Sequence, residues 1–140
     1  MEQVATSDIE SIIDVKTLTM LTNDNPQATE PDWNRVSKLI ELSNNLIDDA
    51  LRNQYPVPLK NKHSVLTGIG SEICIYNIYL IRNRHKVTED IKNNYQNALR
   101  LLDDYSKGKK VLSGELSESP SAIKVNQRTK VFSSDVLSRY

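Results

Sequence analysis

Residues 61–84 read NKHSVLTGIGSEICIYNIYLIRNR, and as a helix this stretch would be apolar on most sides. A β-strand is the competing interpretation for residues 73–81, because isoleucine and tyrosine favour strands. The apolar residues there do not alternate with polar ones, however, and no neighbouring segment resembles a hairpin partner. We therefore predict a central helix from about Asn61 to Arg84. Such a helix must be covered on several sides, by its own bundle or by a neighbouring subunit.

A second long helix is predicted downstream, from Thr88 to Lys107. Thr88 is suited to cap its start, and acidic Glu89 and Asp90 fill the first turn, where the helix dipole is positive. Gly108 follows the last turn, where a left-handed residue commonly ends a helix. Its apolar residues recur every three or four positions and so share one face: Ile91, Tyr95, Ala98, Leu102 and Tyr105.

A third long helix is predicted upstream, beginning at Asp32 or Asn34 and stopped by Pro56. The residues of its predicted inward stripe are Val36, Leu39, Ile40, Leu46, Ile47, Ala50, Leu51 and Tyr55.

Before it, residues Ser7–Leu21 predict one or two short helices, with Ser7 as N-cap. The residues expected to face inward there are Ile9, Ile12, Ile13, Val15, Leu18 and Leu21. Together these elements predict an all-α fold, a small bundle of about five helices, two short and three long.

The character of the chain changes after Gly108. Residues 112–140 contain several serines and few apolar residues, without a helical stripe. We predict a helical domain over residues 1–111 and an extended C-terminal arm over residues 112–140, which a partner would order. Short alternating runs in the arm could form strands only against a partner's edge. The residues that we expect to anchor the arm on a partner are Val125, Val131, Phe132 and Leu137.

The composition argues against several classes of function. Eighteen basic residues balance eighteen acidic ones, so the chain has no general attraction for nucleic acid or an anionic membrane. Cys74 is the only cysteine, which rules out an internal disulfide. No uninterrupted apolar run approaches the ~20 residues that span a bilayer, and the N-terminus lacks the features of a signal peptide. We expect a cytoplasmic protein that does not enter the membrane.

No group of residues predicts catalysis, a metal or a cofactor. His63 and His85 are the only histidines, each eleven residues from Cys74, and zinc would need closer pairs and a fourth ligand. Gly68-Ile69-Gly70 lacks the preceding strand and third glycine of a dinucleotide-binding loop, so it more simply allows another helix to approach. Two acidic pairs, Asp48-Asp49 and Asp103-Asp104, are interpreted as solvated, since adjacent helical residues point about 100° apart.

Several motifs along the chain carry a family resemblance. They are Ser7-Asp8-Ile9, Tyr55-Pro56-Val57-Pro58-Leu59, the run from Tyr95 to Leu102, Gly108-Lys109, and the C-terminal Lys130-Val131-Phe132-Ser133 with Leu137. In this order they resemble a family of small proteins of Mu-like prophages, a family classified as a domain of unknown function. The resemblance covers most of the chain.

The resemblance implies a part of the virion. Genes of this family lie among head and tail morphogenesis genes, and the expected fold is that of head–tail connector (adaptor) proteins. Such proteins form a ring, usually of twelve subunits, between the portal and the tail. The implied partners are therefore portal and tail-completion proteins and further copies of the chain, with nucleic acid only as DNA passing through the ring. The implied location is the host cytoplasm and then the virion neck, and the resemblance brings no catalytic residues.

Two other functions remain open from the sequence. A small helical regulatory or nucleic-acid-binding protein of a mobile element would need a basic face, for which Arg82, Arg84, His85 and Lys86 are candidates. An enzyme would have to use Cys74 or the histidines, and nothing in the sequence favours that.

Overall fold

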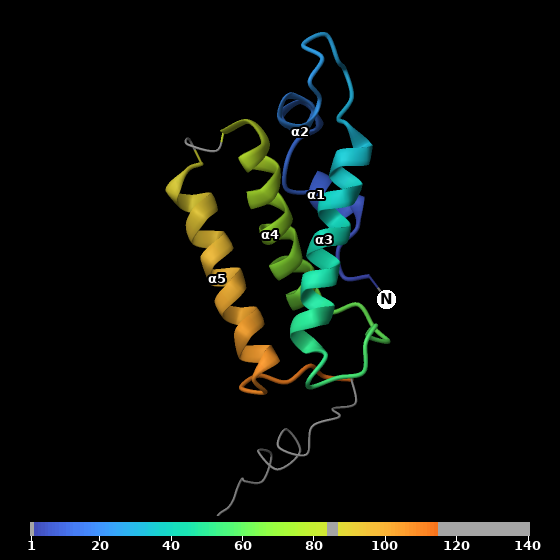
Figure 1. Cartoon of the computed structure of the whole chain (residues 1–140), viewed down its shortest axis with the longest axis vertical. Coiled ribbons are helices and arrows are strands. Elements are labelled where there is room, and N and C mark those ends of the chain that lie inside the picture. Colours follow the sequence, from blue (N-terminus) through green and yellow to red (C-terminus); the bar gives the residue numbers. More distant parts are fainter. Residues whose placement is uncertain (1, 84–86, 115–140) are drawn as a thin grey trace, which may run out of the picture.

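The computed structural model describes residues 2–83 and 87–114, and all regular elements in them are α-helices. Two short helices, α1 (Thr6–Glu10) and α2 (Val15–Thr22), precede three long ones. The long helices are α3 (Trp33–Leu51), α4 (Ser64–Asn83) and α5 (Glu89–Ser106). Figure 1 shows α4 between α5 and α3, with α1 and α2 beside the end of α3 that begins at Trp33. The predicted all-α bundle of two short and three long helices is confirmed.

Helix α4 is the centre of the bundle and contacts each of the other four helices. It covers the stretch predicted as the central helix, and the strand alternative for residues 73–81 is wrong. By length and composition alone, Ser64–Arg82 is also apolar enough to cross a membrane, which the sequence analysis did not anticipate. The packing of four helices against α4 explains its apolar character as that of a core helix.

The core has two parts along α4. The first half of α3 packs with the second half of α4 and with α1 and α2, through residues such as Val36, Ile40 and Ile78. The second half of α3 packs with the first half of α4 and with α5, through residues such as Ile47, Leu66 and Leu102. Helices α3 and α4 are therefore antiparallel, and α5 covers only one part of the core directly.

The ends of the long helices follow the predicted capping. Asp32 and Thr88 accept hydrogen bonds from the backbone N–H groups of Arg35 and Ile91, at 3.3 Å each. At the end of α5, Gly108 has φ +77°. The N–H of Gly108 donates to the carbonyl of Tyr105 and that of Lys109 to the carbonyl of Asp104, an arrangement that ends a helix with a left-handed residue.

The N-terminal helices depart from the prediction in three places. The N-cap of α1 is Ala5 instead of Ser7, and the Asp8 carboxylate accepts from the Ala5 N–H at 2.8 Å. Ile12 and Val15 were expected to face inward, yet they are 52% and 43% exposed. Because α1 ends at Glu10, the turn after it takes Ile12 out of the helical spacing that the prediction assumed. Val15 is the first residue of α2 and is partly exposed there.

The segment after α5 returns to the bundle before the described residues end. Leu112, the first residue of the predicted arm, is buried in the core formed by α3, α4 and α5. Its backbone N–H donates to the Tyr55 hydroxyl at 2.9 Å. The Asn61 amide donates to the Gly114 carbonyl at 3.4 Å, so the described chain contacts the bundle up to its last residue.

Candidate functional site

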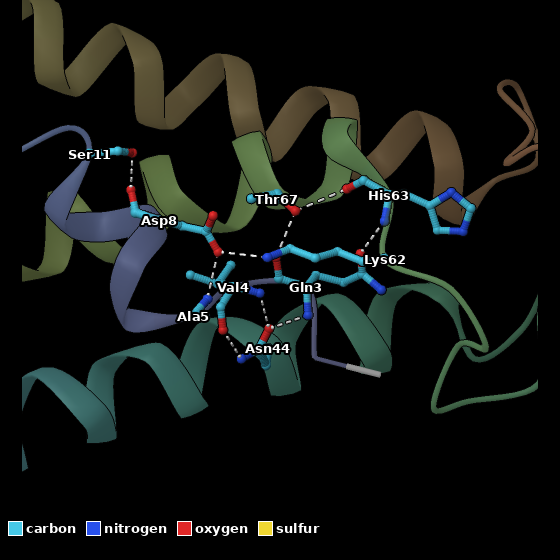
Figure 2. Close-up of polar contacts among 9 residues, drawn as sticks. All are labelled: Gln3, Val4, Ala5, Asp8, Ser11, Asn44, Lys62, His63 and Thr67. Carbon is cyan, nitrogen blue, oxygen red and sulfur yellow. Dashed lines mark hydrogen bonds and ion pairs between the residues drawn. The ribbon is translucent and has the colours of Figure 1, made fainter.

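The first residues of the chain lie between α3 and α4, and we call residues 2–5 the N-terminal strap (Figure 2). On the α3 side, the Asn44 side-chain oxygen accepts from the backbone N–H groups of Gln3 and Val4 at 3.1 and 3.0 Å. The Asn44 amide donates to the Val4 carbonyl at 3.1 Å. All three residues are buried, so these bonds replace water for backbone groups that would otherwise lack a partner.

On the α4 side, the same strap is held by residues at the start of the helix. The Gln3 side-chain amide donates to the Asn61 carbonyl at 2.9 Å, and its oxygen accepts from the His63 N–H at 2.7 Å. The Thr67 hydroxyl donates to the Gln3 carbonyl at 2.7 Å. Because these groups are satisfied by the strap itself, the network is structural and fixes α3 relative to α4.

An ion pair near the strap adds to its contacts with α3 and α4. The Lys62 ammonium lies 2.9 Å from the Asp8 carboxylate, which joins α1 to the segment before α4 (Figure 2). The hydrogen bond from Lys62 is the largest cause that lowers the pKa of Asp8 below its ordinary value of 3.8, and the Ala5 N–H adds to it.

The Asp8 ion pair predicts a specific acid sensitivity. A carboxylate with a lowered folded-state pKa stabilises the protein above its ordinary pKa, and this contribution is lost as the pH falls through the folded value. The stability gap between the wild-type chain and Asp8→Asn should thus be present at pH 7 and close as the pH falls below 3.8. Urea unfolding at a series of pH values measures it. Lys62→Gln should remove the larger part of this increment and leave the part that the Ala5 N–H supplies. A gap unchanged at low pH would contradict the prediction.

An open groove lies between α4 and α5 on the surface of the bundle. It has a volume of about 400 Å³, and its lining is mostly apolar, with Val65, Gly68, Ala98 and Leu101 among its residues. Glu72 lies at the groove as well, and burial raises the pKa of its carboxyl, although a hydrogen bond with Asn94 opposes this. An apolar floor with one carboxylate suits an apolar side chain accompanied by a cation.

Two leucines on α3 form an exposed apolar feature of the surface. Leu42 is 55% exposed and Leu46 is 40% exposed, and they lie one turn apart. The sequence analysis placed Leu46 on the inward stripe, which is wrong, because the buried face of α3 is centred on Val36, Ile40 and Ile47. We call Leu42 and Leu46 the α3 ridge.

Among the described residues, those considered for catalysis do not assemble into a site. Cys74 is buried, and its burial raises the pKa of the thiol to about 12, so it is neither a thiolate nor accessible. Within residues 2–83 and 87–114, no three His, Cys, Asp or Glu side chains gather so that they could hold a metal ion. His85 lies outside the described residues.

The charged side chains considered for function mostly form surface ion pairs. Asp49 pairs with Arg52 at 2.6 Å, and Asp103 pairs with Lys107 at 2.9 Å, in each case with the residue that caps the end of the same helix. Asp49 and Asp103 are exposed, as predicted, whereas Asp48 is only partly exposed and burial raises the pKa of its carboxyl. Arg82 of the predicted basic cluster pairs with Asp24 in the α2–α3 loop. The other cluster members, residues 84–86, lie outside the described part of the chain.

The four predicted anchors of the arm also lie outside the described residues: Val125, Val131, Phe132 and Leu137. Their role in binding a partner stays a prediction. The features that the structure adds are the groove and the α3 ridge, neither of which was predicted.

Comparison with known proteins gives one finding. A comparison with curated proteins finds no match. Residues 4–130 match the family model described as Bacteriophage Mu, Gp36, which takes in residues 4–5 of the strap, all five helices and residues 112–130 of the arm. A match of this extent shows the family, in agreement with the resemblance drawn from the sequence. The chain therefore belongs to the bacteriophage Mu Gp36 family of phage proteins.

Proposed function

We propose that this protein is a head–tail connector (adaptor) subunit, which assembles as a ring between the portal and the tail through protein–protein contacts. The observation that carries the proposal is the family match over residues 4–130, which identifies a phage protein. We propose the virion neck as its final location, after synthesis in the host cytoplasm. Its partners would be the portal, tail-completion proteins and further copies of the same chain.

The surface of the described residues supports a role in assembly. The groove and the α3 ridge offer apolar surface at the exterior, which suits contact with proteins better than contact with water. Cys74 is buried, which argues against an enzyme that uses its thiol. The zero formal net charge of the chain gives no general attraction for DNA, so direct nucleic-acid binding is less well supported.

The arm provides the first test. Ending the chain after Gly114 should leave a folded helical body, because the two parts of the core use residues up to Leu112. The truncated protein should keep its helical circular dichroism and cooperative unfolding but fail to co-purify with the portal protein of the same phage. The physical reason is that the apolar anchors and the tethering that the arm supplies would both be lost.

A matched pair of full-length variants separates the anchors from the length of the arm. Replacing Val125, Val131, Phe132 and Leu137 with serine should abolish co-purification, whereas replacing Ser117 and Ser119 with alanine should not. Retained portal binding by the truncated chain would overturn the role of the arm. Steep salt-dependent binding to duplex DNA, without portal binding, would indicate a nucleic-acid-binding protein instead.

A further inference from the structure

The groove opens on the side of α4 that faces away from α3. A Cβ atom at Gly70 would lie 2.9 Å from the Ile47 side chain of α3, so this side of α4 is in contact with α3. A Cβ atom at Gly68 would meet nothing within 4 Å, and Gly68 lines the groove. Gly68 and Gly70 are two positions apart, and side chains at that spacing on a helix point about 200° apart. The groove and α3 are therefore on opposite sides of α4.

The α3 ridge, extended by Lys38, matches the groove in length. Along α4, the groove extends from Ser64 to Glu72, which is about 12 Å of helix at 1.5 Å per residue. Leu42 and Leu46 are separated by about 6 Å on the same scale, and exposed Lys38 lies one turn before Leu42, so Lys38 to Leu46 also covers about 12 Å. A line of Lys38, Leu42 and Leu46 thus presents two apolar side chains and one cation. The groove presents an apolar floor and one carboxylate, that of Glu72.

We propose that the α3 ridge of one copy packs into the α4–α5 groove of the next copy. Leu42 and Leu46 lie against Val65, Gly68 and Leu101, where the missing Cβ of Gly68 allows a close approach. Lys38 then pairs with Glu72. This contact rests on the proposed function, because it supplies the joint that a ring of identical subunits requires.

The contact joins two different surfaces, and this determines the kind of assembly. When a surface packs against the same surface of a second copy, the two copies form a closed dimer. When the ridge of one copy packs into the groove of another, each dimer still has one free ridge and one free groove. Such head-to-tail contacts repeat and end only when the rotation between copies closes a ring.

The test uses cysteine pairs in the full-length chain. One protein carries Leu46→Cys and another Gly68→Cys, two positions where the side chain has space. Native Cys74 is buried and does not compete. With diamide as oxidant, the mixture should form disulfide-linked dimers at least about tenfold faster than either protein alone. A chain with both substitutions should give a ladder of higher oligomers.

The control mixture pairs Leu46→Cys with Gln96→Cys, an exposed position of α5 that does not line the groove. Equal cross-linking in the test and control mixtures would overturn the proposed contact, as would faster cross-linking of Leu46→Cys with itself. Adding Lys38→Glu to the Leu46→Cys protein should slow the reaction roughly tenfold, and Glu72→Lys in the other protein should restore it. Failure of this charge exchange would remove the Lys38–Glu72 pairing from the proposal.

The outcome also separates this inference from the proposed function. Portal binding without the specific cross-link would leave the connector function and overturn the contact. The specific cross-link without portal binding would establish the contact between copies and overturn the connector function.

Discussion

Replacing Asn44 with alanine is expected to lower the free energy of unfolding by about 3 kcal/mol. The change removes the one side chain that satisfies the backbone N–H groups of Gln3 and Val4 and the Val4 carbonyl. These backbone groups are buried, so without Asn44 the strap must leave them unpaired or detach. A loss of this size corresponds to a fall of roughly 12 °C in Tm, measurable by urea or thermal unfolding.

Two further variants make the Asn44 prediction specific. Asn45→Ala, at the exposed neighbouring position, should change the free energy of unfolding little. Alanine has a higher helix propensity than asparagine, so the small change should be stabilising. Asn44→Asp keeps an acceptor for the two N–H groups but cannot donate to the Val4 carbonyl, so its loss should be intermediate. If Asn44→Ala lost no more stability than Asn45→Ala, the strap would not depend on this side chain.

The two glycines of α4 are expected to respond to alanine with opposite signs. At Gly70, the added methyl group would lie 2.4 Å from the Val4 side chain and 2.9 Å from that of Ile47, both buried. Overpacking should outweigh the gain in helix propensity and lower the free energy of unfolding by about 2 kcal/mol. At Gly68 the space is open, so alanine should raise the free energy of unfolding by about 1 kcal/mol.

A double variant tests the cause of the Gly70 effect. Val4→Ala removes the methyl group nearest to the new Cβ, so Gly70→Ala should cost less in that background than in the wild-type chain. Urea unfolding of the four proteins gives the coupling directly. Equal effects of alanine at Gly68 and Gly70 would show that the strap and α3 do not pack against Gly70.

The long helices could be predicted because local signals agree there. In α5, the capping residues Thr88 and Gly108 and a regular apolar face indicate the same boundaries that the structure has. Helix α4 was predictable because its apolar residues do not alternate. The N-terminal region was less predictable, since Ser7 is as good an N-cap by type as any residue. The helix instead starts after Ala5, whose N–H donates to the Asp8 carboxylate and whose neighbours Gln3 and Val4 bind Asn44.

The strap and the groove could not be predicted because each depends on distant residues. Nothing near Asn44 in the sequence indicates that its amide binds the backbone of Gln3 and Val4 about forty residues earlier. The groove arises where small residues of two helices, Gly68 and Ala98, lie at one surface. The signal available was the pair of glycines in α4, and it did not reveal which of them faces the interior.

The N-terminal strap also constrains the order in which the chain can fold. Its hydrogen bonds to α3 and to the start of α4 join residues separated by 40 to 64 positions, as between Val4 and Asn44 and between Gln3 and Thr67. Closing such long loops costs entropy that a single helix does not have to overcome. Residues 2–5 are synthesised before α3 and α4, yet the surface that they bind exists only once α3 and the start of α4 have emerged from the ribosome and paired. We expect the strap to be among the last segments to reach its native position.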